Sequence, residues 1–377
     1  MSSWEDNVRK VVPYTPGEQP NQPDMVKLNT NENPYPPSPA VEEAMKKLDL
    51  DSMRLYPEPT ASELVNALAE RYQLKPDQVF VGIGSDDVLA MSFLTFFNSG
   101  SPILFPDITY SFYDVWADCF RIPYIKVPLD KDFRIRPEDY CPKGETGEYS
   151  VPTDAECSDY KTLFGEKPIG GIVFPNPNAP TGELLGLDSI EQILKANPDV
   201  VVIVDEAYID FGGQSALPLL AKYDNLFITQ TFSKSRSLAG MRVGFALGSS
   251  RMIKYLNDVK YSFNSYTLSR AAISMAAASV KDEEYFQETI RKIVDTREWA
   301  KDQLRELGFT FPDSSSNFIF AKHERVPAKE LFQALREAHI YVRYFDQPRI
   351  NNYLRITVGT REQMDKLFDF LRTYLTK

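Results

Sequence analysis

The chain has 377 residues, of which 43% are hydrophobic and 25% charged, with a formal net charge of -11. This composition is ordinary for a globular protein, and the length allows more than one domain. An acidic chain without a basic block disfavours nucleic-acid binding, and no apolar run is long enough to span a bilayer, so we predict neither partner.

Cysteine and histidine are both scarce. The three cysteines, Cys119, Cys141 and Cys157, have no CxxC spacing, and the polar first ten residues lack the apolar core of a secretory signal. These features predict a reducing, cytoplasmic location without a disulfide framework. The two histidines, His323 and His339, disfavour both a multi-histidine metal site and a histidine-activated nucleophile. We predict no metal; an enzyme of this composition would take its difficult chemistry from an organic cofactor.

Residues 1 to about 40 are rich in proline, asparagine and other polar residues. Tyr14, Leu28 and Tyr35 are spaced through this segment. Because such side chains gain from burial, we predict an N-terminal arm that lies on the protein and is not a free tail.

Strand-like and helix-like segments alternate through residues 41–281, the predicted large domain. Apolar runs typical of strands buried on both faces occur at 78–84, 101–106, 124–129, 169–177, 200–208, 226–233 and 242–248. Helical spacing of apolar residues follows at 85–97 and 109–120. This alternation predicts an α/β fold with a mainly parallel sheet and helices on both faces. Ligands of such sheets bind beyond the carboxyl ends of the strands.

The pattern changes at about residue 282. A long amphipathic helix is predicted at 283–308. Strand-like and helix-like segments then follow at 317–322, 328–340, 341–345, 353–359 and 361–375. We therefore predict a smaller α+β domain over residues 282–377.

Residues 141–168 fit neither pattern. They have no clear period and contain many turn residues, although they separate two strand-like segments of the large domain. We predict a surface excursion of low order. The alternative is an unrecognised helix near residues 154–164.

The stretch VGIGSDDVL, residues 81–89, passes from a strand into a helix near Ser85. Free N–H groups at a helix start beside Gly82 and Gly84 can form an anion site, although most such turns bind nothing. Asp86 and Asp87 would repel a phosphate, but they are also ordinary first-turn residues that can cap the helix.

Asp205 lies at the carboxyl end of the apolar run 200–204, where it could pair with a protonated ring nitrogen. Tyr208 lies three residues further on and could face the same cavity. The alternative for Asp205 is a capping or loop carboxylate.

Lys234 follows the apolar run 226–232. An amine in a partly desolvated pocket has a lowered pKa and can condense with a carbonyl group, whereas an isolated lysine is usually a solvated surface residue. Ser233 offers a hydroxyl, and Arg242 could reach a phosphate bound at the Gly84–Ser85 turn. A lysine for a Schiff base, an acid for a pyridinium, a tyrosine for a phenolate oxygen and an anion cradle together describe pyridoxal 5′-phosphate.

The sequence resembles the fold-type I pyridoxal-phosphate aminotransferases and, within them, the histidinol-phosphate aminotransferases. The resemblance covers nearly the whole chain, through the segments VVPYTPGE, KLNTNENPYPP, RLYPEPT, GIGSDDVL, FPDITYSFY, FPNPNAPTG, VDEAYIDF, TFSKSRSLAGMRVGF, SSNFIF, YVRYF and YLRITVGT. It implies amino-group transfer between L-histidinol phosphate and 2-oxoglutarate, giving imidazole-acetol phosphate and L-glutamate, in histidine biosynthesis.

The resemblance also implies roles for single residues toward the cofactor. Lys234 would form the Schiff base, Asp205 would pair with the pyridine nitrogen and Tyr208 with the ring oxygen O3′. The remaining cofactor residues are Tyr110, which would stack on the ring, and Gly84, Ser85, Asp86, Ser233 and Arg242, which would hold the phosphate. Tyr56 would reach the cofactor phosphate of a neighbouring subunit, which implies a homodimer with shared active sites.

For the substrate, the resemblance implies a second group of residues. Arg355 matches the arginine that binds a carboxylate, and Arg343 and Tyr14 match residues that favour a phosphate-bearing substrate. Asn31 and Glu32 lie on the arm that would close over the site.

One position departs from the family pattern. Ala179 stands where the family usually has the asparagine that bonds O3′. Asn178 precedes it and is the predicted substitute, but a shift of one residue turns a side chain away unless the loop adapts. Without Asn178, O3′ would depend on Tyr208 alone.

Three other functions remain open from the sequence. An aromatic amino-acid aminotransferase would need no phosphate grip, so Arg343 argues against it. A threonine-phosphate decarboxylase has a similar sequence and needs no 2-oxo acid. A regulatory module built on an aminotransferase-like domain would need a DNA-binding segment, which the N-terminus does not offer.

Overall fold

The computed structural model describes residues 3–142, 156–157 and 169–376. Most of the predicted excursion at 141–168 lies outside these residues. Its described part, β5 (Glu156–Cys157), is a strand that pairs antiparallel with β4 (Tyr124–Val127), so these two residues are extended rather than helical.

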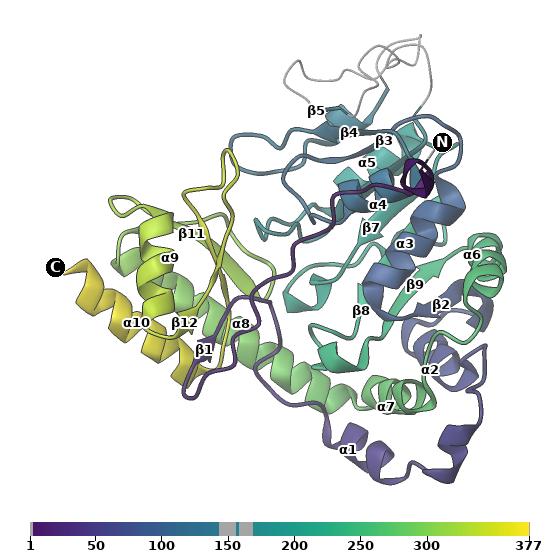
Figure 1. Cartoon of the computed structure of the whole chain (residues 1–377), viewed down its shortest axis with the longest axis horizontal. Helices are drawn as coiled ribbons and strands as arrows, with labels where there is room; N and C mark the ends of the chain where they lie inside the picture. The colour runs from purple at the N-terminus through teal and green to yellow at the C-terminus, as the bar shows by residue number, and fades with distance from the viewer. Residues whose placement is uncertain (1–2, 143–155, 158–168, 377) are drawn as a thin grey trace.

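A sheet of eight strands organises the chain from residue 79 to residue 248 (Figure 1). Its order is β2 (Val79–Gly82), β9 (Gly244–Gly248), β8 (Leu226–Thr231), β7 (Val202–Asp205), β6 (Gly171–Pro175), β3 (Ile103–Pro106), β4 and β5. The pairs from β8 to β4 are parallel, which confirms the predicted mainly parallel sheet. β9 runs antiparallel to both of its neighbours.

Helices cover both faces of this sheet, as predicted. One face carries α3 (Gly84–Phe96), α4 (Tyr113–Phe120) and α6 (Ser250–Phe263); the other carries α2 (Ser62–Tyr72), α5 (Leu187–Ala196) and α7 (Arg270–Lys281), with α1 (Pro39–Lys46) packed beside α7. Successive strand residues point to opposite faces, so Val202 and Val204 enter one core and Ile203 the other.

The C-terminal part begins with the long helix α8 (Glu283–Glu306), whose N-cap is Asp282, at the proposed domain boundary. A four-stranded antiparallel sheet follows, in the order β10 (Phe309–Thr310), β11 (Phe318–His323), β14 (Leu354–Thr357) and β13 (Arg343–Tyr344). The helices α9 (Ala328–Glu337) and α10 (Arg361–Leu375) complete the C-terminal part. Across the described ranges, no helix is long and apolar enough to cross a bilayer.

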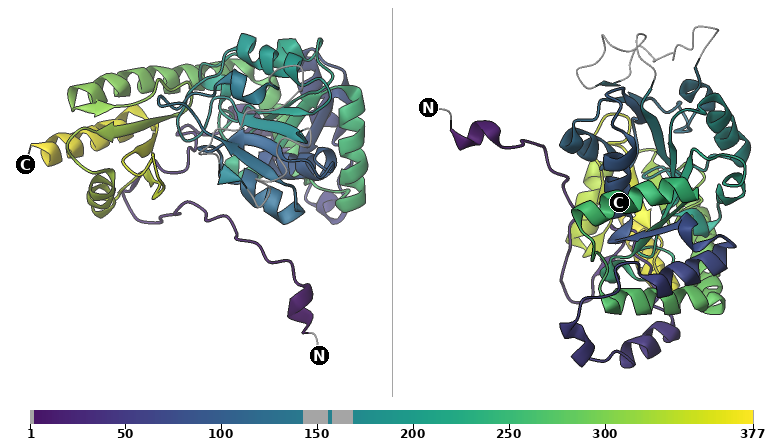
Figure 2. Two further views of the ribbon diagram at one scale, coloured as in Figure 1. Left: turned by 90° about the horizontal axis from the view of Figure 1, so that it is seen from above. Right: turned by 90° about the vertical axis from the view of Figure 1, so that its right-hand side faces the viewer.

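The N-terminal arm joins the two parts. Its strand β1 (Val26–Lys27) pairs with β12 (Ile340–Tyr341), and Leu28 is fully buried in the C-terminal core. Further toward the N-terminus, the Tyr14 ring stacks on Phe112 at 4.1 Å between ring centroids. The first turn, Trp4–Asn7, buries no residue and projects from the body (Figure 2). The predicted arm therefore lies on the protein over its later residues and not over its first turn.

Candidate active site

A cavity lies beyond the carboxyl ends of β6, β7 and β8. Its empty space is about 570 Å³ with the open mouth included. The lining residues are Ser85, Asp86, Tyr110, Pro175, Ala179, Asp205, Ala207, Tyr208, Thr231, Ser233, Lys234 and Arg242. The structure thus brings together residues from five separate segments of the chain, as the rule for open α/β sheets requires.

Lys234 stands in the connection that follows β8. Its Nζ donates a hydrogen bond to the Thr30 carbonyl of the arm at 3.0 Å and lies 5.7 Å from the centre of the Tyr208 ring. A backbone carbonyl and a ring face hold the amine in place without the strong pairing of a carboxylate. The amine is therefore positioned at the cavity and open to reaction with a carbonyl carbon.

Asp205 closes the floor of the cavity at the end of β7, and its side chain is buried. Its carboxylate accepts hydrogen bonds from the Tyr113 hydroxyl at 3.0 Å, the Thr229 hydroxyl at 3.3 Å and the Ala207 N–H at 3.3 Å. Burial raises the pKa of Asp205 to about 6 in spite of these three donors. A cationic N–H group in the cavity would offset that desolvation, so the site suits a protonated ring nitrogen.

The Tyr208 hydroxyl is oriented by the arm. Asn31, itself buried, donates its side-chain N–H to the Tyr208 oxygen at 2.9 Å. Because this bond uses a lone pair of the hydroxyl oxygen, the O–H proton of Tyr208 stays available. Tyr208 can therefore donate to an oxygen atom in the cavity.

An anion cradle forms where α3 begins. Gly84 has a φ of +78°, and a Cβ built on Gly244 would lie 2.3 Å from the Ser85 nitrogen, so this close approach of two backbones requires glycine. Beside the helix start, Arg242 donates from Nη1 to the Ser233 hydroxyl at 3.3 Å. Backbone N–H groups, a hydroxyl and a guanidinium together are the donors that a phosphate takes.

The two aspartates of this turn have different partners. Asp87 accepts the N–H of Ile83 at 2.9 Å and so serves the helix start, as the sequence predicts. Asp86 instead accepts from Arg242 Nη2 at 3.0 Å and from the Tyr110 hydroxyl at 2.7 Å. Its carboxylate therefore holds two predicted cofactor residues in place at the cavity wall.

A second, larger cavity of about 1090 Å³ adjoins the first and shares Tyr110 with it. Arm residues that include Tyr14 line it, and so does Arg343. Within the described residues, the Arg343 side chain has only a ring contact with Phe345 and no hydrogen bond or ion pair. Its guanidinium is therefore available to an anionic ligand.

Arg355 lies directly opposite Arg343 in the β13–β14 pair. Its Nη2 donates to the Asn29 carbonyl at 3.1 Å, while its buried Nε has no partner among the residues that the structure describes. Burial lowers the pKa of Arg355. Two adjacent guanidinium groups with unused donors form a site for a phosphate or a carboxylate.

The family model described as aminotransferase class I and II matches residues 23–371. The chain belongs to this family. Membership confirms the predicted fold class, the enzyme class of aminotransferase and pyridoxal phosphate as the cofactor.

Two relatives carry a narrower name. The chain is 50% identical to the histidinol-phosphate aminotransferase of Lactococcus lactis subsp. lactis (strain IL1403), over 100% of this chain and 97% of the relative. It is also 50% identical to the histidinol-phosphate aminotransferase of Pseudomonas putida (strain KT2440), over 98% of this chain and 99% of the relative. These names match the subgroup that the sequence resembles.

Solved structures share the fold at lower identity. A putative histidinol-phosphate aminotransferase from Erwinia carotovora atroseptica superposes with a TM-score of 0.80 at 23% identity, covering 94% of this chain and 96% of that one. The L-threonine-O-3-phosphate decarboxylase of Porphyromonas gingivalis gives 0.73 at 21% identity, covering 93% and 99%. Because both reactions occur on this fold, the fold of an aminotransferase does not by itself choose between them.

Asn178, Glu32 and Tyr56 do not line the cofactor cavity, and Arg355 lines neither of the two cavities. The Asn178 amide donates to the Ile108 carbonyl and the Thr181 hydroxyl, both at 3.0 Å, while Ala179 lines the cavity. The loop does not adapt, so the structure does not bring Asn178 to the cofactor cavity. Glu32 is paired with Lys27 on the arm. Tyr56 is 77% exposed and stacks on Tyr266 at 4.6 Å.

Several residues at the site were not predicted from the sequence. Tyr113 and Thr229 bond Asp205, Thr231 lines the cavity, and Asn317 bonds the Asn31 carbonyl at 3.0 Å. The three-residue spacing from Tyr110 to Tyr113 at a helix start was a usable signal for Tyr113. The remaining contacts join distant segments and have no local signal.

Proposed function

We propose that the protein transfers the amino group of L-histidinol phosphate to 2-oxoglutarate with pyridoxal phosphate as cofactor, a step of histidine biosynthesis. The products are imidazole-acetol phosphate and L-glutamate. The observation that carries the proposal is the single cavity that holds Lys234, Asp205, Tyr208 and an anion cradle, next to the paired Arg343 and Arg355.

The residues of the cavity fit the cofactor one by one. When bound, pyridoxal phosphate supplies an electron sink for the carbon that loses its proton. The N–H groups at the start of α3, with Ser233 and Arg242, would hold the phosphate. Asp205 would keep the ring nitrogen protonated, and Tyr208 would donate to the ring oxygen. Lys234 Nζ, released by the incoming amine, would take the proton from the amine-bearing carbon as general base.

The two arginines explain how one site takes two different substrates. Histidinol phosphate has no α-carboxylate, so its phosphate would bind at Arg343 and Arg355. In the second half-reaction the same guanidinium groups would bind the carboxylates of 2-oxoglutarate. A shared anion site of this kind requires no rearrangement between the half-reactions.

The two amino donors are expected to react at different rates. Histidinol phosphate should convert the bound cofactor rapidly, because its phosphate reaches both arginines, whereas phenylalanine should convert it slowly. Stopped-flow absorbance of the cofactor-loaded protein with each donor measures both rates. Comparable or faster conversion with phenylalanine would instead support an aromatic amino-acid aminotransferase. No conversion with either donor would support the decarboxylase, and threonine phosphate would then be the substrate to mix.

The active site is proposed to be shared between two copies of the chain. Tyr56 lies outside both cavities of its own chain. It stacks on the exposed Tyr266, and the exposed aromatic side chains Tyr255, Tyr261 and Phe263 lie on α6. Aromatic residues are enriched at protein interfaces. In a homodimer Tyr56 would reach the phosphate of the partner's cofactor.

Sedimentation equilibrium is expected to give twice the chain mass of 43.0 kDa, because these aromatic side chains would be buried between two copies. Tyr56→Phe should weaken cofactor binding in that dimer, since it removes one hydroxyl from the phosphate. Tyr255→Phe is the matched control at another exposed tyrosine. A monomer at micromolar concentration, or equal cofactor affinity of Tyr56→Phe and the wild type, would contradict the shared site.

The cytoplasmic location stays a prediction, which cell fractionation would test.

A further inference from the structure

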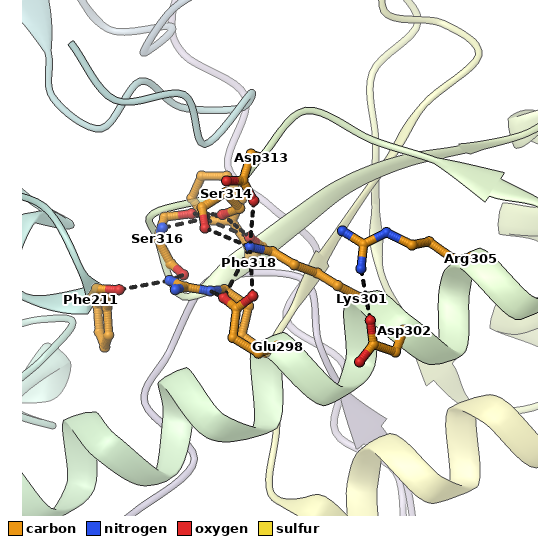
Figure 3. A network of polar contacts seen from close by, with 10 residues as sticks. Phe211, Glu298, Lys301, Asp302, Arg305, Asp313, Ser314, Ser316 and Phe318 are labelled. Carbon is orange, nitrogen blue, oxygen red and sulfur yellow. Dashed lines mark hydrogen bonds and ion pairs between the residues drawn. The ribbon is translucent and has the colours of Figure 1, made fainter. Parts of the chain in front are cut away.

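Arg297 on α8 lies buried behind the active-site segments, with 5% of its surface exposed. Its Nη1 donates to two backbone carbonyls, that of Phe211 at 2.7 Å and that of Ser316 at 2.9 Å. Phe211 ends the short helix η5 (Ile209–Phe211), which directly follows Tyr208. Figure 3 shows Phe211 and Ser316, which lie on different segments of the chain and face the same guanidinium group. One guanidinium therefore fixes the Tyr208 segment to the C-terminal part of the chain.

The same two parts are also joined at the Tyr208 hydroxyl. Asn317, the residue after Ser316, donates its side-chain N–H to the Asn31 carbonyl at 3.0 Å. Asn31 in turn donates to the Tyr208 oxygen at 2.9 Å. These contacts form a closed ring. The Tyr208 hydroxyl is bonded to Asn31, Asn31 to Asn317, and the neighbouring Ser316 carbonyl to Arg297. Arg297 closes the ring through the Phe211 carbonyl, three residues after Tyr208.

Thr357 also holds Asn31, since its hydroxyl accepts from the Asn31 N–H and donates to Asn31 Oδ1, both at 3.0 Å. The ring through Arg297 is therefore one of two supports of the Tyr208 hydroxyl, and it is the one that also holds the Tyr208 backbone.

A guanidinium is suited to this role because its planar donors have fixed directions. Glu298, half exposed on the same helix, accepts from Arg297 Nε at 2.8 Å. Phe211 is fully buried, so its carbonyl has no access to bulk water as a replacement donor. Loss of the guanidinium would leave that buried carbonyl without its partner, and the segment would move to restore a hydrogen bond.

Lys301 lies one turn further along α8 and is equally buried. Its Nζ bonds Glu298, the Asp313 carboxylate at 2.7 Å and the Ser314 carbonyl at 3.2 Å. All of these partners lie within residues 298–314 (Figure 3). Lys301 therefore belongs to the same polar network but has no bond to the Tyr208 segment, which makes it a matched control.

We infer that Arg297 is a positioning residue for the reaction, acting through Tyr208. By fixing the segment after Tyr208 relative to Asn317, it sets the direction in which the Tyr208 hydroxyl donates to the cofactor's ring oxygen. This inference rests on the proposed function, because it needs a cofactor oxygen at the Tyr208 hydroxyl.

The inference is tested by the pH at which the absorption band of the bound cofactor changes. The pH of that change would depend on how well the protein stabilises negative charge on the ring oxygen of the bound cofactor. A hydroxyl donor stabilises that charge and lowers the transition pH. A change in the direction of the Tyr208 hydroxyl should therefore raise the pH at which the absorption band changes. We expect Arg297→Met to raise it by about 0.5–1 pH unit and Tyr208→Phe by about 1 unit or more.

The double variant separates a positioning role from a general loss of stability. In a Tyr208→Phe background, Arg297→Met should add no further shift, because the hydroxyl through which Arg297 acts is absent. Lys301→Met should lower the melting temperature and leave the transition pH unchanged. The other charged or titratable groups near Lys234 and Tyr208 are unaltered in every variant: Glu32, Asp86, Tyr110, Tyr113, Asp205, Arg242 and Arg355.

Two results would overturn the inference. One is an unchanged transition in Arg297→Met, and the other is an equal shift with and without the Tyr208 hydroxyl. If Arg297→Met does not fold, Asn317→Ala opens the ring at a different bond and should raise the transition in the same way; an unchanged transition there would contradict the inference. A wild-type protein that shows no cofactor band would contradict the proposed function instead, so the two failures are distinguishable.

Discussion

Replacing Lys234 by alanine should lower turnover by at least about 10⁴-fold while the fold persists. The variant removes both the nitrogen that binds the cofactor covalently and the base that moves the substrate proton. No other amine lines the cavity, so no neighbour can take over either task within the described residues. The fold should tolerate the change, because the amine makes a single hydrogen bond, to the Thr30 carbonyl.

The measurement is the rate of glutamate formation from histidinol phosphate and 2-oxoglutarate, with melting temperatures recorded in parallel. Lys222→Ala is the control, since the Lys222 side chain is 62% exposed and pairs only with Glu191 on the surface. Activity of Lys234→Ala within about tenfold of the control would remove this lysine from the mechanism and with it the proposed function.

The sequence predicts the sheet and its two helical layers because burial alone determines the pattern. A strand covered on both faces must be apolar throughout, as residues 202–204 are. The direction of a strand relative to its neighbours, in contrast, has no such apolar pattern in the sequence. The run that forms β9 reads like its neighbours but lies antiparallel to both of them. Direction therefore became visible only in the structure.

The site residues that lie at the ends of strands could be predicted from the sequence. Asp205 ends the buried strand β7 and Lys234 stands in the connection after the buried strand β8, and parallel strands bring such residues to one edge. Contacts that depend on a long crossing of the chain were not predictable. The bonds of Asn31 to Tyr208 and of Asn317 to Asn31 join residues 177 and 286 positions apart, and no local pattern encodes them.

Asn178 shows the limit of transferring a role by one position. Its neighbour Ala179 occupies the place at the cavity, and the amide of Asn178 is used by the Ile108 carbonyl and the Thr181 hydroxyl behind it. Successive residues of an extended loop face opposite ways, so a shifted asparagine can approach the cofactor only if the loop changes course. Tyr208 is then the hydroxyl donor on which the proposed cofactor contact depends.

Arg355→Met is expected to lower kcat/KM by about 100-fold or more in both half-reactions. The residue offers a buried Nε without a partner in the described part of the chain, and Arg343 stands directly opposite it, so a bound anion would take charge-assisted bonds from both. Removing the buried guanidinium deprives the phosphate of histidinol phosphate and the carboxylate of 2-oxoglutarate alike. Single-turnover rates with each substrate, measured against concentration, separate the two half-reactions.

The matched control is Arg349→Met. The Arg349 guanidinium is used by Asp107 at 2.9 Å and by the carbonyls of Leu129 and Asp130, so it has a structural role at the edge of the same region. A loss confined to 2-oxoglutarate in Arg355→Met would show that the phosphate binds elsewhere, and Arg343 would then be the residue to test. Equal losses in both half-reactions of Arg355→Met, with Arg349→Met unchanged, would support one anion site that serves both substrates.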